Sequence, residues 1–313
     1  MSPTRRRAAV TLTGCFAALA LCLLAALWLV RPRASAVVTA EVSVGGTVAS
    51  VCVPEQPAGA PLVILCHGFT GNREGDGHFA PLAQALARRG VATIRPDFPG
   101  CGGSPLASTD YTLSAMQYLL NTCVELMRTD YGVDTSRLAL VGHIMGGRLA
   151  SLYAAPDPGR YPVCALALWS PANGDGLRGL EFLDIEEFAR VEALAAEAAA
   201  NGAVTAWNFT MSSRFFEEMA ASAPNDALRA YGGPVLLCYT GSEGILSDET
   251  RQQTIDTVSA LGGTVLTEPF AEASHNYIAA DRDRAAELDP ELDRALRDAT
   301  EAFLLAQLGA DGS

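Results

Sequence analysis

The chain has 313 residues, of which 49% are hydrophobic, so it is long enough to bury the core of one large domain or two small ones. Its 22 basic residues are all arginine, they are outnumbered by 35 acidic residues, and the formal net charge is −13. This acidic balance argues against binding to nucleic acid and against electrostatic binding to anionic lipid, because both present negative charge.

The first 36 residues differ in character from the rest of the chain. Three arginines, Arg5 to Arg7, precede an uncharged apolar run over residues 8–30. This run is close to the roughly 20 residues needed to span a bilayer and exceeds the usual length of a cleaved signal sequence. Residues 34–36, Ala-Ser-Ala, nevertheless resemble a cleavage site. We therefore expect either a signal anchor that holds residues 37–313 outside a membrane, or secretion after cleavage near Ala36.

From residue 37 onward, strand-like and helix-like stretches alternate. Residues 37–53 alternate β-branched residues around Gly45-Gly46 and predict a β-hairpin. Buried strands are then predicted at residues 61–68, 91–98, 137–143, 163–171, 234–241 and 264–270. Helices are predicted at residues 79–90, 112–132, 146–155, 249–263 and 289–309. Uninterrupted apolar strands that alternate with helices are typical of an α/β fold with a mostly parallel sheet covered on both faces.

Residues 172–232 interrupt this alternation. They contain an alanine- and glutamate-rich helix at residues 186–202 and a short strand at residues 203–211. An insertion between two sheet strands usually forms a cap over the carboxyl ends of the strands, where ligands bind in open α/β sheets. We therefore expect a single domain over residues 37–313 with a cap or lid at about 172–232.

Six cysteines follow Ala36, and we expect them to be mostly free and buried. Cys66, Cys164 and Cys238 lie inside apolar runs, where a thiol behaves as a small hydrophobic side chain. The chain has no Cys-x-x-Cys, and its four histidines are scattered, so no metal site is expected. The glycine-rich residues 100–103 lack the spacing of a dinucleotide-binding loop, so no cofactor is expected either.

The most informative motif is a glycine-framed turn between a predicted strand and a predicted helix. Residues 142–146 read Gly-His-Ile-Met-Gly. They fit the nucleophile elbow, G-x-S-x-G, at every position except the serine, which is replaced by Ile144. An aliphatic side chain has no lone pair with which to attack a carbonyl. The turn is therefore present while its usual reactive group is absent.

Three further motifs follow strand ends, where the carboxyl ends of parallel strands gather. Residues 67–72 read HGFTGN after the first central strand, and residues 97–104 read DFPGCGGS after the next. His275 follows the last strand, and an acid is expected shortly after the strand at residues 234–241. The chain order of elbow, acid and histidine is the order found in α/β-hydrolases.

With these motifs, the chain over roughly residues 50–308 resembles the α/β-hydrolase superfamily, and within it the cinnamoyl- or feruloyl-esterase-like branch of serine hydrolases. The resemblance implies cleavage of small carboxylic esters through an acyl-enzyme, with His275 as the general base. It further implies that the backbone N–H groups of Phe69 and Met145 form the oxyanion hole. His67 is expected to be structural, with hydrogen bonds to its own loop.

The acid of the triad is not uniquely indicated by the sequence. Glu243 is the best-placed candidate and Asp248 the second; the alternative is that Gly244 stands at the position where relatives have aspartate. A glutamate can serve as the acid in this superfamily.

Ile144 leaves three interpretations of function open. The chain can be an esterase that is inactive or very weak, because the acyl-enzyme route is closed. It can be an exported pseudoenzyme that binds a small ester-like or other ligand in the retained pocket. Alternatively, Ile144 is a recent or deliberate replacement of serine in an otherwise intact site. All three take a small molecule as the partner, and none indicates an oligomeric state.

Overall fold

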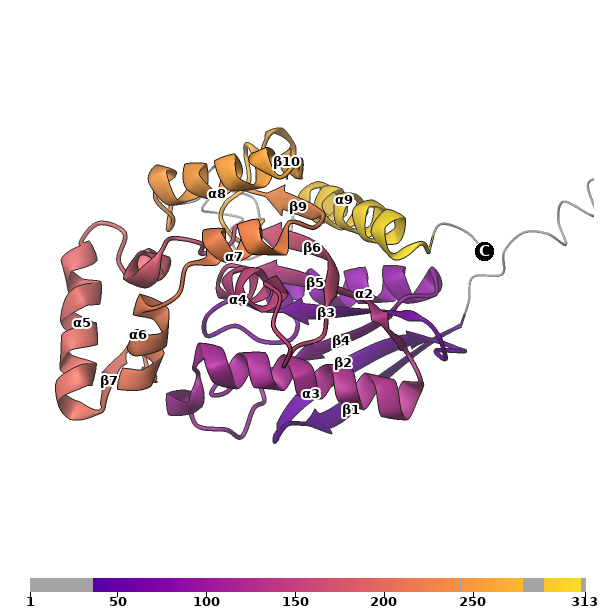
Figure 1. Ribbon diagram of the computed structural model, residues 1–313, viewed down its shortest axis with the longest axis horizontal. Helices are drawn as coiled ribbons and strands as arrows, with labels where there is room; N and C mark the ends of the chain where they lie inside the picture. Colours follow the sequence, from indigo (N-terminus) through magenta and orange to yellow (C-terminus); the bar gives the residue numbers. More distant parts are fainter. Residues whose placement is uncertain (1–35, 242–243, 278–289, 311–313) are drawn as a thin grey trace, which may run out of the picture. The chain divides into compact units, whose positions relative to one another are not determined.

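A mixed eight-stranded sheet forms the centre of the structure, a computed structural model that describes residues 36–241, 244–277 and 290–310 (Figure 1). All of these residues belong to one compact unit that begins at Ala36. In chain order the strands are β1 (Val37–Val44), β2 (Thr47–Pro54), β3 (Pro61–Cys66), β4 (Ala92–Pro96), β5 (Asp134–His143), β6 (Val163–Trp169), β9 (Val235–Cys238) and β10 (Thr264–Leu266).

The strands lie in the order β1-β2-β4-β3-β5-β6-β9-β10. The hairpin of β1 and β2 is antiparallel, and β2 pairs antiparallel with β4, while every later pair is parallel. The predicted hairpin around Gly45-Gly46 and the predicted mostly parallel sheet are both confirmed. Because the inner strands are parallel, their carboxyl ends, and the loops that follow them, gather at one edge of the sheet.

Helices cover both faces of the sheet. They are α2 (Phe79–Arg88), α3 (Leu113–Tyr131), α4 (Met145–Ala154), α7 (Pro224–Tyr231), α8 (Asp248–Ala260) and α9 (Pro290–Leu308). The side chains of Val63 and Leu65 pack into a core with α2 and α9, whereas Leu62 and Ile64 face a core shared with α3, α4, α7 and α8. Successive strand residues point to opposite faces, so an uninterrupted apolar strand fills both cores.

The segment between β6 and β9 carries additional elements at one end of the sheet. They are the 3-10 helix η3 (Gly176–Leu183), α5 (Phe188–Asn201), β7 (Ala203–Ala206), β8 (Phe209–Ser212) and α6 (Ser213–Ala220). We refer to residues 172–222 as the cap. α7, which follows it, packs against α4 and so belongs to the helical layer of the sheet.

Two predicted strands differ from the structure. The single strand predicted at residues 203–211 is a hairpin of β7 and β8, because Trp207 and Asn208 take positive φ angles of 50° and 59° and reverse the chain. Two successive positive φ values are those of the tight hairpin turn that suits the twist of the paired strands. The strand predicted at residues 264–270 ends after Leu266, and Pro269 lies in the 3-10 helix η4 (Glu268–Phe270) instead.

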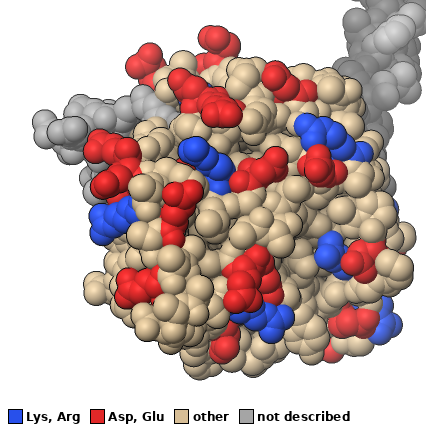
Figure 2. All heavy atoms as spheres, turned by 60° about the vertical axis from the view of Figure 1, so that its left-hand side comes forward, with Lys and Arg blue, Asp and Glu red and all other residues tan. Residues whose placement is uncertain are grey.

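The six cysteines after Ala36 are free, as predicted, and all but the half-buried Cys164 are buried. Within the described part of the chain, none of the helices has the length and apolar character of a membrane span. The predicted anchor at residues 8–30 lies outside that part. On the face shown in Figure 2, arginines of the described residues stand apart from one another and beside carboxylates, so they form no continuous basic area there.

A buried arginine joins the sheet layer to the cap. Arg148, on α4, is 0% exposed and donates hydrogen bonds to the main-chain oxygens of Ala172 (2.8 Å), Gly174 (2.5 Å) and Gly176 (3.2 Å) and to the hydroxyl of Ser222 (2.6 Å). Burial lowers the pKa of its guanidinium to about 9. Carbonyl dipoles from both ends of the cap thus surround one charge and fix the cap to the start of α4.

Replacing Arg148 by methionine should destabilise the protein by about 3–5 kcal/mol, because it leaves several buried carbonyl groups without a donor. The matched control is Arg128→Met, since the Arg128 side chain is 51% exposed and pairs with Glu125, its neighbour on the helix surface. That change should cost no more than about 0.5 kcal/mol. Urea unfolding of both variants gives the comparison. Equal losses would contradict the assigned role of Arg148.

Candidate active site

The turn between β5 and α4 holds Ile144 in a strained main-chain conformation. Its φ and ψ angles are 52° and −111°, and a β-branched residue at positive φ is a conformational outlier. The Ile144 N–H donates to the carbonyl of Trp169 (3.0 Å), and its carbonyl accepts from the N–H of Ala172 (3.0 Å). Main-chain hydrogen bonds therefore hold the residue at the tip of the turn whatever its side chain is.

Glycines are required on both sides of this tip. A Cβ atom built on Gly142 would lie 2.3 Å from the carbonyl oxygen of Gly146, and one built on Gly146 would lie 2.0 Å from the carbonyl oxygen of Cys66. Real Cβ atoms do not approach that closely. The glycine frame seen in the sequence thus reflects a close approach of the elbow to the end of β3.

The Ile144 side chain packs over the loop that follows β3. A Cβ atom built on Gly68 would lie 3.1 Å from Cδ1 of Ile144 and 3.4 Å from its Cβ. The aliphatic side chain is therefore in direct contact with the main chain of the 67–72 loop. This loop is the one that the sequence assigns to oxyanion binding.

His67 holds the 67–72 loop, as predicted. Its Nε2 accepts from the N–H of Phe98 (3.0 Å), so the hydrogen is on Nδ1, which donates to the carbonyl of Gly68 (2.7 Å). Burial lowers the pKa of the imidazole to about 4, which keeps this tautomer neutral. His67 is therefore structural.

Asp97, the first residue of the DFPGCGGS turn, ties that turn to the same loop. Its buried carboxylate accepts from the N–H of Arg73 (2.7 Å) and the N–H of Gly103 (2.8 Å), and it pairs with the Arg73 guanidinium (2.8 Å). The carboxylate thus neutralises one arginine and closes its own turn. This explains the aspartate and the glycines of the motif without a catalytic role.

His275 lies at the pocket, on the loop after β10. It is buried, with 7% of its surface exposed, and its ring stacks on that of His143 with centroids 5.6 Å apart and 27° between the planes. Burial lowers the pKa of His143 well below its usual value, and the nearby imidazoles of His275 and His78 lower it further. A neutral His143 thus provides a flat surface that fixes the orientation of the His275 ring.

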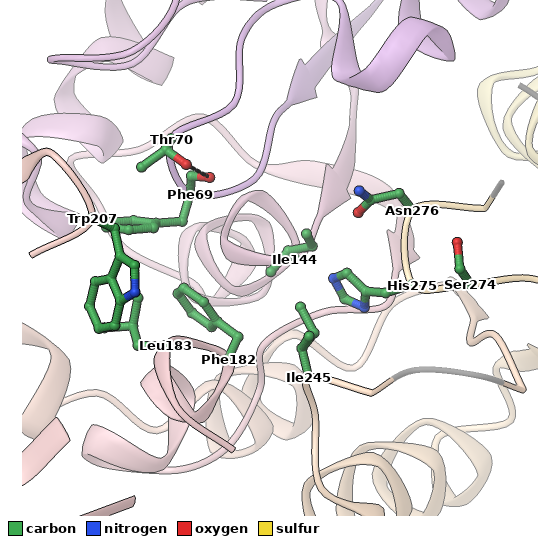
Figure 3. Close-up of a pocket in the computed structure, with 10 residues that line it drawn as sticks. All are labelled: Phe69, Thr70, Ile144, Phe182, Leu183, Trp207, Ile245, Ser274, His275 and Asn276. Carbon is green, nitrogen blue, oxygen red and sulfur yellow. Dashed lines mark hydrogen bonds between the residues drawn. The ribbon is translucent and has the colours of Figure 1, made fainter. Parts of the chain in front are cut away.

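A cavity of about 470 Å3 opens beside these residues (Figure 3). Ile144 and His275 lie on one side of it, and aromatic and aliphatic side chains of the cap lie on the other. Its lining comprises Phe69, Thr70, Ile144, Phe182, Leu183, Trp207, Ile245, Ser274, His275 and Asn276. A mostly apolar cavity with a few convergent polar groups is the usual form of a small-molecule site.

A second, smaller cavity of about 240 Å3 lies against the same loop. It shares Phe69, Thr70, Ile144 and Asn276 with the larger one, and it is otherwise lined by polar groups that include His143 and Asp76. The Ile144 side chain therefore borders an apolar chamber and a polar chamber at once.

Phe69 connects the 67–72 loop to the cap. Its ring centroid lies 5.5 Å from that of Phe182, 4.9 Å from that of Phe209 and 6.2 Å from that of Phe215. Aromatic pairs at such spacings add stability beyond their buried area. For Phe69 the sequence predicted a role of the main-chain N–H alone. Its side chain therefore has a second role, which is to anchor the cap.

The structure brings Phe69, Ile144 and His275 to one cavity and buries Met145 at the first turn of α4. The side chain of Asp248 is 99% exposed and its carboxylate pairs with Arg251 (3.1 Å), so it faces solvent. Glu243 lies outside the described residues and stays a prediction.

Several residues at the site were not indicated by the sequence motifs. Phe182, Leu183 and Trp207 come from the cap, and a buried glutamate of the cap, Glu181, accepts from the N–H of Ser247 at the start of α8 (2.9 Å). Asn208 was the one local signal for the hairpin turn that presents Trp207, since asparagine tolerates positive φ. The positions of Phe182, Leu183 and Glu181 depend on how the cap folds back on the sheet.

The strand order, the elbow and the pocket beneath a cap define the α/β-hydrolase fold. The chain belongs to the Alpha/beta hydrolase family, whose sequence profile matches residues 63–311. A search among curated proteins found no significant relative.

Several solved structures share this fold. Est1E from Butyrivibrio proteoclasticus, solved with ferulic acid bound, is 20% identical, and the match covers 86% of this chain and 99% of that one with a TM-score of 0.62. An esterase from Pyrococcus furiosus is 17% identical, with 88% of this chain and 92% of that one covered and a TM-score of 0.56. At such identities the similarity is one of fold.

His67 should make the protein less stable as the pH falls. Its pKa is about 4 in the folded protein and ordinarily 6.5, so between these values the unfolded chain binds a proton that the folded one does not. The stabilisation is complete above pH 6.5 and declines as the pH falls towards 4. Between pH 7 and pH 5 this amounts to about 2 kcal/mol.

Urea unfolding at the two pH values tests this prediction. His67→Gln, which cannot titrate, should lose about 2 kcal/mol less than the unaltered protein over the same interval. Histidine NMR at pH 5 should show His67 with a single ring N–H. A doubly protonated His67 at that pH would contradict the assignment.

Proposed function

We propose that this chain carries a carboxylic-ester hydrolase site whose nucleophile position is occupied by Ile144, so that it binds small esters and hydrolyses them weakly or not at all. The observation that carries the proposal is the φ angle of 52° at Ile144. Such a conformation costs of order 1–3 kcal/mol for a non-glycine residue and persists where surrounding structure imposes it. In hydrolases of this fold, that conformation projects a reactive side chain from the turn.

The residues around Ile144 support a role in acyl transfer once a hydroxyl is supplied. A serine at position 144 could lose its proton to His275 as it attacks the ester carbonyl, and the alcohol would leave with that proton. The main-chain N–H groups of Phe69 and Met145 are the proposed donors to the oxyanion. The acid that orients His275 is assigned to Glu243, with Asp248 as the weaker candidate because its side chain faces solvent.

With isoleucine at position 144, no acyl-enzyme can form. Serine hydrolases without a triad member retain roughly 10³–10⁴-fold catalysis over water, through binding and oxyanion stabilisation. The contact between Ile144 and Gly68 narrows the space in front of the oxyanion loop, which reduces that residual activity further. A hydrolysis rate near the uncatalysed one is therefore the expectation for this chain.

Ligand binding without turnover is the second candidate function. It is favoured by the apolar cavity, in which Phe69, Phe182 and Trp207 present aromatic surface and Ile144 adds an aliphatic wall. An esterase whose serine was recently or deliberately replaced would have the same pocket. For either function we place the domain outside a membrane, held by an N-terminal anchor, or in the extracellular space after cleavage. This placement rests on residues 1–36 alone.

Ile144→Ser should create esterase activity against p-nitrophenyl esters. We expect kcat/KM to rise about 10³-fold or more over the unaltered chain, because the nucleophile and its base are then both present. Hydrolysis is followed by release of p-nitrophenol. Ile144→Ala is the matched control, since it removes the bulk of the side chain without supplying a hydroxyl. It should regain at most the residual catalysis of a site without a nucleophile and stay well below Ile144→Ser.

Two outcomes would overturn this assignment. Full activity of the unaltered chain would mean that the elbow is not the site of attack. Inactivity of both Ile144→Ser and the double variant with Gly244→Asp would mean that the remaining machinery is not intact, and it would favour the binding function. Adding His275→Gln to an active Ile144→Ser variant should abolish the gain.

Binding can be measured directly on the unaltered chain through tryptophan fluorescence. Trp207 is 46% exposed and lines the cavity, whereas Trp169 is 1% exposed in the core. A small aryl ester such as methyl cinnamate should quench the emission saturably, because it stacks near the indole. The quenching should disappear in Trp207→Phe. Absence of any saturable change, or its persistence in Trp207→Phe, would count against binding in this cavity.

A further inference from the structure

A buried histidine outside the pocket contacts the loop that carries His275. His78, at the start of α2, is 2% exposed. Its Nε2 lies 2.9 Å from the carbonyl oxygen of Asn276, the residue next to His275, and its Nδ1 lies 2.9 Å from Oδ1 of Asp293 on α9. We propose that His78 is a positioning residue that sets the orientation of His275 through the Asn276 main chain. This inference rests on the proposed function of His275.

Both partners of His78 are acceptors. The Asn276 carbonyl faces Nε2 and the Asp293 carboxylate faces Nδ1, so each hydrogen bond needs a hydrogen on the ring nitrogen that faces it. The bond that positions the loop is the one from the Nε2–H to the Asn276 carbonyl. Burial raises the pKa of Asp293, but its bonds to His78 and to Arg297 outweigh this and hold the pKa below its usual value. The Asp293 carboxylate is thus charged and lies against the His78 ring.

Asp293 is itself held in place on α9. Its second oxygen, Oδ2, accepts from Nη1 of Arg297 one turn further along the helix (2.9 Å), and only 13% of its side chain is exposed. Because the carboxylate is held in place, it orients the His78 ring so that Nε2 points towards the Asn276 carbonyl. α2 and α9 pack against each other, so this arrangement links two helices of one sheet face to the loop of the site.

The His275 loop is held at three consecutive residues. The ring of His275 stacks on His143, the carbonyl of Asn276 accepts from His78, and the hydroxyl of Tyr277 donates to the carbonyl of Cys238 (2.8 Å). The side chains of His275 and Asn276 both reach the cavity (Figure 3). The bond from His78 holds the peptide group between residues 276 and 277, one residue beyond His275, so its loss would loosen the main chain on which His275 stands.

Such a displacement matters because proton transfer depends on short distances. A base must lie within hydrogen-bond reach of the group it deprotonates, and misplacement by about 1 Å can cost about 10²-fold in rate. Ground-state binding of an apolar ester in the cavity depends little on the direction of one imidazole. Loss of the His78 bond should therefore lower kcat and leave KM nearly unchanged.

Two substitutions separate the two hydrogen bonds of His78. In His78→Gln the amide nitrogen takes the place of Nε2 and can still donate to the Asn276 carbonyl, while the bond to Asp293 is lost. In His78→Asn the amide nitrogen takes the place of Nδ1, so the bond to Asp293 is kept and the bond to Asn276 is lost. Both variants remove the ring, so their packing losses are similar.

In an Ile144→Ser background, His78→Asn should lower kcat about tenfold or more with little change in KM, and His78→Gln should stay within about threefold of its parent. Equal losses in the two variants, parallel to equal losses in melting temperature, would mean that His78 only supports the fold. Unchanged kcat in both would mean that the Asn276 carbonyl needs no donor.

A second measurement needs no activity and uses the Ile144 chain. With four histidines in the whole protein, ring signals can be assigned by substitution in ¹⁵N-histidine NMR. His78 should show a hydrogen on Nε2, and the ring signals of His275 should shift in His78→Asn but not in His78→Gln. A His78 without a hydrogen on Nε2, or His275 signals that stay unchanged in both variants, would overturn the proposal. Inactivity of Ile144→Ser would instead count against the esterase site alone.

Discussion

The site depends on the contact between the elbow and the end of β3. β3 and β5 are neighbours in the sheet, and the main chain of Gly146 lies so close to the Cys66 carbonyl that a Cβ atom would be 2.0 Å from it. This contact brings the first turn of α4 against the 67–72 loop. The chain must also turn from strand to helix over a single residue, and the positive φ of Ile144 follows from that requirement. The pocket floor is thus determined by main-chain packing.

The sheet and its covering helices could be predicted from the sequence because their signals are local. An inner parallel strand is buried on both faces, so it appears as an uninterrupted apolar run such as that of β3 or β5. The glycine frame of the elbow and the position of His275 after the last strand are also readable, because each follows a strand end. The long insertion at about residues 172–232 could also be recognised, because it breaks the alternation of strand and helix.

What the sequence could not indicate are the contacts between distant segments. Arg148 is one residue of an amphipathic helix in the sequence, and only the folded cap supplies the carbonyls that surround it. His78 precedes a helix without any motif, and its partners Asn276 and Asp293 lie about 200 residues further along the chain. The acid loop is ambiguous for another reason, since Glu243 and Asp248 are close in sequence and only their side-chain directions can separate them.

Position 144 places main-chain geometry and side-chain chemistry in conflict. A β-branched side chain disfavours positive φ, yet the hydrogen bonds of Ile144 to Trp169 and Ala172 retain that angle. The side chain recovers part of the cost by packing beside Gly68. In the proposed reaction an ester carbonyl would approach through this space, so the contact that stabilises Ile144 would also obstruct acyl transfer. A serine at position 144 would lose that packing and leave the approach of the ester open. The folded scaffold accommodates either residue, whereas the proposed chemistry requires serine.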